Sequence, residues 1–191
     1  LHGEGHSFPT RRSSDLKHVV VLDILVLAMG FVIRALAGIE AIQTTEAPVE
    51  ITSYFLLTTL FLALFLAAAK RRSELVTLKD MEVGSTRRVL KEYTPEFLDI
   101  ILTIASAGTL FSYALWTTQG QFAQTATGST NTYLLVLTMP YVMYGMFRYL
   151  WMALKRGEGG APETLLLEDI PLLATVVLWM VTVVAVLAKV S

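Results

Sequence analysis

Residues 19–41 read VVVLDILVLAMGFVIRALAGIEA. A stretch of about 20 mainly apolar residues is long enough to cross the hydrocarbon core of a bilayer as one helix. Four further stretches of this kind follow in the chain, at 51–69, 97–116, 132–154 and 170–190. One or two such segments could form the core of a soluble protein, but five in succession predict an all-α membrane protein with five transmembrane helices.

The composition agrees with a membrane protein. Of the 191 residues, 54% are hydrophobic and only 16% are charged, whereas a soluble domain carries about 25% charged residues. The formal net charge of −1 argues against binding of nucleic acid. The chain has no cysteine, which excludes a disulfide scaffold, an iron–sulfur cluster and a thiol nucleophile. Only three histidines are present, so a multi-histidine metal centre is not expected.

The basic residues between the apolar stretches predict the orientation in the membrane. Residues 70–96 hold seven Lys and Arg, whereas residues 40–50 and 117–131 hold none. Lys155 and Arg156 follow the fourth stretch. Because basic loops of membrane proteins stay in the cytoplasm, we expect Lys17, the 70–96 loop and the loop after Lys155 on the cytoplasmic side of a bacterial plasma membrane. The alternation of basic and non-basic loops also supports the count of five helices.

The loop at 70–96 carries two further signals. Thr94, Pro95 and Glu96 predict the start of the third membrane helix, with Thr94 as its N-cap and Pro95 at the first helical position. Short helices at the membrane interface are predicted within the loop by the near-helical spacing of Glu74, Leu75, Leu78, Val89 and Leu90.

The first 16 residues, LHGEGHSFPTRRSSDL, differ from the rest of the chain. They are polar, and they lack the apolar core of a signal peptide. The run at 6–16, HSFPTRRSSDL, is similar to the in-frame translation of a common sequencing adapter. We therefore expect residues 1–16 to be a non-native or disordered segment, and residues 17–191 to be the carboxy-terminal part of a transmembrane domain.

Two charges lie inside the first apolar stretch, Asp23 and Arg34. Ionisable residues in a membrane helix are costly and usually mark function or a structural pair. Eleven residues are close to three helical turns, so the two side chains share a face, about 16 Å apart along the axis. We expect this face to point into the bundle and each charge to have a partner elsewhere. For Asp23, simple hydration near the cytoplasmic interface is the alternative.

A second charged group follows the second stretch, where Lys70, Arg71 and Arg72 precede Glu74. Three cations beside a carboxylate suit a phosphate group and a divalent metal. The alternative is that these cations only reflect the preference of basic residues for the cytoplasmic side. Gly157, Gly159 and Gly160 form a turn that could also approach a phosphate, although it is not a Walker A loop.

A third group lies along the fourth stretch. Tyr141, Tyr144, Arg148 and Lys155 follow one another at spacings of three, four and seven residues, which place them on one helix face. Two hydroxyls and two cations suit an anion, and the alternative is an aromatic belt with basic flanks. Together, the three groups suit a diphosphate at the membrane surface with Mg²⁺ as counter-ion, and the apolar helices suit a lipid chain.

Residues 17–38, KHVVVLDILVLAMGFVIRALAG, resemble the fifth helix of the UbiA-like intramembrane prenyltransferase superfamily. Further runs resemble its decaprenyl-phosphate phosphoribosyltransferase branch in order and spacing; they lie at 65–75, 87–93, 140–150 and 157–163. The resemblance implies a nine-helix bundle of which these are the last five helices. It also implies Mg²⁺-dependent transfer of a phosphoribosyl group from phosphoribosyl diphosphate to a polyprenyl phosphate, for the arabinan precursors of a cell wall.

The sequence departs from the pattern of prenyl-diphosphate enzymes in that superfamily. Their first aspartate-rich motif would precede residue 17, so this chain alone is expected to be inactive. Their second such motif is replaced here by residues 70–75, with only Asp80 and Glu82 downstream. This difference favours a donor held mainly by cations. Because the acceptor phosphate is already an anion, the reaction needs no general base.

The resemblance and the charge pattern together suggest roles for the charged residues. The expected catalytic group is Lys70, Arg71 and Arg72 for the phosphates of the donor, with Glu74 for Mg²⁺ or the ribose. The expected substrate-binding group, which grips the acceptor phosphate or organises the cavity, is Lys17, Asp23, Arg34, Tyr144, Arg148 and Lys155. Removing the charge of Arg71 or Arg72 is expected to reduce turnover sharply and leave expression intact.

Three other interpretations stay open. The first is another reaction of the same superfamily, such as prenylation of an aromatic ring or of haem. The second is a transporter subunit, although Pro140 is the only proline in the middle of an apolar stretch. The third is a non-catalytic assembly partner. The sequence leaves the oligomeric state open, a homo-oligomer included.

Overall fold

The computed structural model describes residues 21–42, 52–80, 93–119, 135–155 and 162–190, and these residues are helical apart from short connections. In chain order the helices are α1 (Leu22–Ile42), α2 (Ser53–Asp80), α3 (Pro95–Gln119), α5 (Met139–Lys155), α6 (Pro162–Glu168) and α7 (Ile170–Val190). A 3₁₀ turn at 135–138 precedes α5. Residues 1–16, Lys17 and the glycine-rich turn at 157–160 lie outside the described residues, so the expectations for them stay predictions.

The prediction of an all-α membrane protein agrees with the described helices, but the count of five spans is only partly supported. Three helices contain a stretch long and apolar enough to cross a membrane, and these stretches are Leu22–Ala41, Ser53–Thr77 and Pro95–Thr118. In α7 the apolar stretch is shorter, Ile170–Val186, and α5 has only 17 residues. The fourth and fifth spans and the nine-helix bundle therefore stay predictions.

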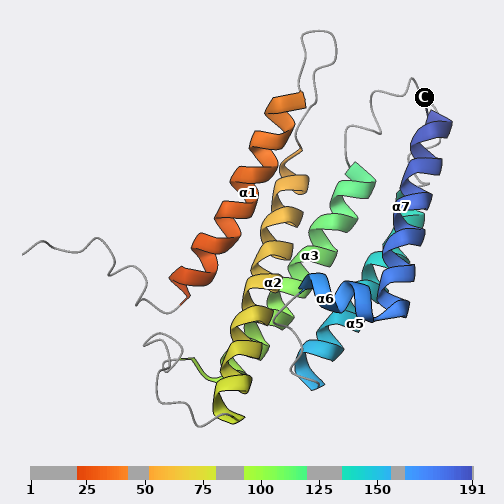
Figure 1. Ribbon diagram of the computed structural model, residues 1–191. Helices are drawn as coiled ribbons and strands as arrows, with labels where there is room; N and C mark the ends of the chain where they lie inside the picture. The colour runs from red at the N-terminus through yellow and green to blue at the C-terminus, as the bar shows by residue number, and fades with distance from the viewer. Residues whose placement is uncertain (1–20, 43–51, 81–92, 120–134, 156–161, 191) are drawn as a thin grey trace, which may run out of the picture.

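The long helices run alternately up and down, and successive helices lie side by side (Figure 1). α2 packs against both α1 and α3, and α5 packs against both α3 and α7. The short α6 lies crosswise beside the start of α7. Through this topology the start of α1, the end of α2, the start of α3 and the end of α5 meet at the lower end in Figure 1, which we call the charged end.

Small side chains bring α2 and α3 close together. Ala67, Ala68 and Ala69 of α2 are buried, and a Cβ added at Gly108 of α3 would lie only 2.6–2.8 Å from ring atoms of Phe61. Small residues at helix interfaces allow such approach in membranes, where close packing replaces the hydrophobic effect as the driving force. Larger buried side chains, among them Phe65 and Met152, then join α2 to α5.

Two expectations about helix ends can be compared with the structure. Thr94 caps α3, because its Oγ1 accepts a hydrogen bond of 3.2 Å from the Phe97 amide, and Pro95 takes the first helical position. This start was predicted from the sequence. Residues 73–80, for which the sequence predicts a short interfacial helix, are helical, but they continue α2 without a break. These residues contain neither Gly nor Pro to end the helix.

Candidate substrate site at the charged end

Arg71 joins the first two helices at the charged end. Its Nε donates to Oδ2 of Asp23 on α1 at 2.7 Å, and its Nη1 donates to Oε2 of Glu74, one turn further along α2, at 2.7 Å. The Arg71 side chain is only 12% exposed. One cation therefore lies between two carboxylates, and Glu74 pairs with Arg71 rather than with Lys70.

Tyr93 belongs to the same group, although only its place in the run at 87–93 pointed to it. Its hydroxyl donates to Oδ1 of Asp23 at 2.7 Å and accepts the amide of Val21 at 2.5 Å. The ring is buried, and burial together with the hydrogen bond to Asp23 raises the pKa of Tyr93 to about 12. The hydroxyl therefore stays a proton donor near neutral pH. We call Asp23, Arg71, Glu74 and Tyr93 the Arg71 cluster.

The two charges of the first apolar stretch have different surroundings. Asp23 has the partners that we expected for a buried charge. Arg34 is exposed, and its guanidinium carbon lies 5.7 Å from the ring centre of Phe31. The face that α1 turns to α2 is formed by Ile24, Ala28 and Val32. The expectation that Arg34 points into the bundle is therefore wrong for the helices that the structure describes.

Arg72 points to the other side of α2. Its Nε donates to Oδ1 of Asp99 on α3, and its Nη1 and Nη2 donate to the carbonyls of Ala153 and Leu154 at 2.6 and 3.1 Å. The last carbonyls of a helix lack partners within the helix, so Arg72 caps the end of α5. These contacts occupy the guanidinium within the protein. A role of Arg72 in holding phosphate stays a prediction.

Arg148 forms the fourth ion pair among the described residues. Its Nη2 lies 2.8 Å from Oδ2 of Asp169, between α6 and α7, and Oδ1 of Asp169 also accepts the amide of Leu172 at 2.9 Å. Asp169 is thus the N-cap of α7, a signal that was visible in the Asp-Ile-Pro sequence at 169–171. The indole of Trp151 lies between the cations of α5, with ring-centre distances of 5.1 Å to Arg148 Cζ and 5.9 Å to Lys155 Nζ.

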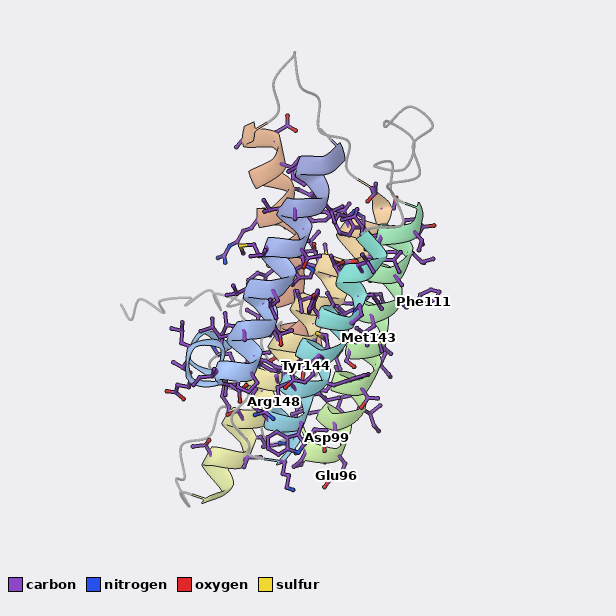
Figure 2. The ribbon with its side chains drawn as sticks, turned by 90° about the vertical axis from the view of Figure 1, so that its right-hand side faces the viewer. Glu96, Asp99, Phe111, Met143, Tyr144 and Arg148 are labelled. Carbon is purple, nitrogen blue, oxygen red and sulfur yellow. The ribbon has the colours of Figure 1, made fainter. Side chains whose placement is uncertain are left out.

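The predicted face of α5 therefore exists in the structure. Tyr144 lies one turn before Arg148 and is exposed, as Figure 2 shows together with Asp99 at the lower end of α3. On α2, Lys70 is exposed and makes no ion pair with any residue that the structure describes. Lys70 and Lys155 are thus two cations at the charged end that remain open to an anionic ligand. Lys17, the remaining predicted site residue, is not described.

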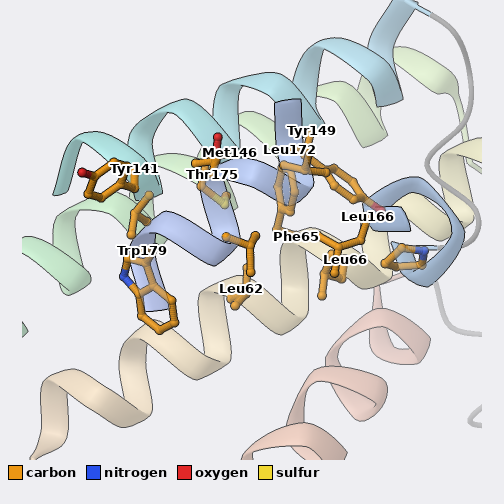
Figure 3. A pocket seen from close by; sticks show the side chains of 14 residues that line it. Leu62, Phe65, Leu66, Tyr141, Met146, Tyr149, Leu166, Leu172, Thr175 and Trp179 are labelled. Atoms are coloured by element: carbon orange, nitrogen blue, oxygen red, sulfur yellow. The ribbon is translucent and has the colours of Figure 1, made fainter. Parts of the chain in front are cut away.

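An apolar cavity of about 380 Å³ lies between α2, α5, α6 and α7 (Figure 3). Aromatic and aliphatic side chains line it, among them Phe65, Tyr141, Met146 and Trp179. Tyr149 and Leu172 also line it, and they are close in sequence to Arg148 and Asp169. An apolar volume therefore lies next to the ion pairs of the charged end, and its size is in the range of small-molecule sites, about 300–1,000 Å³.

Over most of its length the chain is similar to curated bacterial proteins. It is 32% identical over 168 residues to a decaprenyl-phosphate phosphoribosyltransferase of Corynebacterium glutamicum, with 88% of this chain covered. The chain is a homologue of decaprenyl-phosphate phosphoribosyltransferases. Proteins of that name from Mycolicibacterium smegmatis and Mycobacterium tuberculosis are 31% and 30% identical over 171 and 173 residues. No family model matches the chain.

The homology with decaprenyl-phosphate phosphoribosyltransferases confirms the branch that the motifs resemble. The chain spans about half the length of the curated relatives it matches, from 47% to 53%. Among the described residues, no group of three or more Asp, Glu or His could hold a metal ion by itself. The two carboxylates of the Arg71 cluster both bind the arginine, so ligands from a substrate would have to complete any metal site there.

Proposed function

We propose that this chain is the carboxy-terminal part of a membrane enzyme that transfers a phosphoribosyl group from phosphoribosyl diphosphate to a polyprenyl phosphate such as decaprenyl phosphate. The observation that carries the proposal is the homology with proteins named for this activity, over 88% to 91% of the chain. The sequence runs at 65–75 and 157–163 support the same branch. We retain the UbiA-like superfamily as the wider family.

The arrangement at the charged end supports a substrate with a phosphate head and an apolar tail. The cavity between α2, α5, α6 and α7 is apolar, and it lies beside Arg148 and the start of α7. We assign the acceptor phosphate to Arg148, Lys155 and Tyr144, with the first units of the lipid chain in the cavity. Arg148 is held by Asp169, but its side chain is 29% exposed and can still meet an anion.

We assign the donor to the Arg71 cluster and Lys70. In the reaction an oxygen of the acceptor phosphate attacks C1 of the ribose, the bond from C1 to the diphosphate breaks, and diphosphate leaves. Negative charge grows on the leaving group while positive charge grows on the ribose ring. We assign Lys70 and Arg71 to the leaving diphosphate, whose charge they would stabilise, and Asp23 and Glu74 to the region of the ribose ring. No side chain has to remove a proton.

Mg²⁺ is part of the proposal because diphosphate groups usually bind as its complexes. Mg²⁺ is commonly held by one or two carboxylates together with substrate phosphates, and Glu74 is the carboxylate that we assign to it. When bound, the ion would neutralise charge on the diphosphate. We further propose that the charged end faces the cytoplasm and that the product serves synthesis of cell-wall arabinan.

The test uses the protein extended by the coding sequence upstream of residue 17 and expressed in bacterial membranes. Labelled phosphoribosyl diphosphate, decaprenyl phosphate and Mg²⁺ are supplied, and label is counted in the lipid phase. We expect label that depends on both Mg²⁺ and the lipid. The chain of residues 17–191 alone is the matched control, and it should give none. A folded extended protein that transfers no label, but that prenylates an aromatic acceptor, would reject this branch.

A further inference from the structure

Tyr93 occupies an unusual place at the junction of three helices. It lies just before α3, and its hydroxyl reaches the first turn of α1 by two hydrogen bonds, one to Asp23 Oδ1 at 2.7 Å and one from the Val21 amide at 2.5 Å. Its ring is 4% exposed and packs with Ile24, Leu75 and Leu98. The hydroxyl is therefore held by packing on all three helices.

The backbone that Tyr93 holds is strained. Val21 has a φ of 75°, in the left-handed region that β-branched residues avoid. Strained backbone of this kind persists only where the surrounding structure enforces it, and it gathers at functional sites. The hydrogen bond from the Val21 amide to Tyr93 is a contact that enforces it here, since it fixes the chain at the entry to α1.

Asp23, the partner of Tyr93, links the tyrosine to Arg71. Asp23 uses Oδ1 for Tyr93 and Oδ2 for Arg71 Nε, so the tyrosine and the arginine bind the two oxygens of one carboxylate. Rotation of the carboxylate would break both bonds. An arginine carries five N–H donors, and within the described residues Arg71 uses one for Asp23 and one for Glu74. Three N–H donors remain, and their direction depends on where Asp23 holds the guanidinium.

We propose that Tyr93 is a positioning residue: through Asp23 it fixes the guanidinium of Arg71 so that its remaining N–H donors meet the diphosphate of the sugar donor. The second half of this statement rests on the proposed function, whereas the first half concerns only the protein. Tyr93 itself touches no reacting atom. We expect Tyr93 to affect the binding of the sugar donor. Without the tyrosine, the guanidinium of Arg71 would adopt several orientations.

The first experiment measures the position of Arg71 without any substrate. The full chain in detergent is treated with phenylglyoxal, and modification of each arginine is followed by mass spectrometry. In Tyr93→Phe we expect modification of Arg71 to be about tenfold faster, as for loss of one hydrogen bond to a charged group. Arg34, which is exposed, is the internal reference and should react at the same rate in every variant.

Tyr113→Phe is the matched control variant. Tyr113 is also buried, at 5% exposed, and its hydroxyl pairs with Thr138 at 2.6 Å and accepts from Trp179 at 2.8 Å. It lies 20 residues further along, about 30 Å away on α3. We expect Tyr113→Phe to leave the reactivity of Arg71 unchanged. Equal acceleration by both variants would mean general loosening of the fold and would overturn the proposal.

The second experiment measures the kinetics of transfer in the extended protein. Tyr93→Phe should raise the KM for phosphoribosyl diphosphate about tenfold, with the KM for the lipid phosphate unchanged. A purely structural role would reduce the amount of folded enzyme and leave both KM values alone. Asp23→Asn should act in the same direction, because it removes the charge that holds Arg71.

The two experiments separate the two proposals. If Arg71 reacts at the same rate in Tyr93→Phe and in the unchanged protein, Tyr93 does not position it, whatever the enzyme does. If Arg71 becomes more reactive but the unchanged extended protein transfers no phosphoribosyl group, the proposed function fails and the positioning of Arg71 stands. If Arg71 becomes more reactive and the KM of the donor does not change, Arg71 does not meet the donor and the proposal is overturned.

Discussion

Arg71 and Arg72 are neighbours in the sequence, yet they belong to different parts of the molecule. Arg71 faces α1, where Asp23 and Glu74 bind it and part of its guanidinium has no partner among the described residues. Arg72 faces α3 and α5, where Asp99 and two carbonyl groups bind it. Successive residues on a helix point about 100° apart. Arg71 therefore keeps N–H donors without a partner among the described residues, whereas Arg72 joins α2 to α3 and α5.

The largest effect is expected from Arg71→Leu. Loss of a cation that stabilises a leaving group commonly reduces turnover about 10²- to 10³-fold, and we expect phosphoribosyl transfer by the extended protein to fall by this factor. Transfer of label to lipid measures it, and the amount of protein in the membrane is the control. Arg71→Lys keeps the charge and should retain part of the activity. Full activity of Arg71→Leu would remove the contrast between the two arginines.

The next effect is expected from Arg72→Leu, and it concerns stability. Loss of this side chain leaves two carbonyl groups at the end of α5 and the Asp99 carboxylate without their partner. We expect this loss to destabilise the fold by about 2–4 kcal/mol. Thermal unfolding in detergent and the yield of folded protein measure this change. The sequence alone predicted lower turnover with normal expression. Normal stability together with lost turnover would restore that prediction and contradict the present one.

A smaller effect on stability is expected when Gly108 of α3 is replaced by alanine, and Gly30 of α1 offers the comparison. Gly108→Ala places a methyl group within 3 Å of the Phe61 ring between α2 and α3, and overpacking of this kind costs about 1–3 kcal/mol. At Gly30 of α1 an added Cβ meets nothing within 4 Å in the described structure. Gly30→Ala is therefore the matched control, and its melting temperature should not decrease. Equal loss in both variants would show that the face of Gly30 is covered as well.

The smallest effect is expected at the ion pair between Arg148 and Asp169. Asp169→Ala removes both the N-cap of α7 and the partner of Arg148, and loss of an N-cap alone costs about 1 kcal/mol. Asp169→Asn keeps the cap and removes only the charge, so it should unfold at a higher temperature than Asp169→Ala. If the two variants unfold at the same temperature, the ion pair with Arg148 rather than the N-cap holds α7 in place.

The sequence alone predicts the helical membrane fold, the start of α3 at Thr94-Pro95 and the homology. These depend on local composition, on the spacing of apolar residues and on motifs, all of which are visible along the chain. It also placed the cations near one end, because basic residues favour one side of the membrane. The spacing of Tyr144, Arg148 and Lys155 likewise gave their common face on α5.

The partner of each charge depends on how the helices pack in three dimensions. Helical periodicity fixes the angle between two side chains on one helix, but it does not say which helix lies on either side. Asp23 and Arg71 are 48 residues apart, and Asp23 and Tyr93 are 70 apart. Their contact exists because α1 and the start of α3 both pack near the end of α2. Arg72 contacts α3 and α5 for the same reason, since the end of α5 lies on its side of α2.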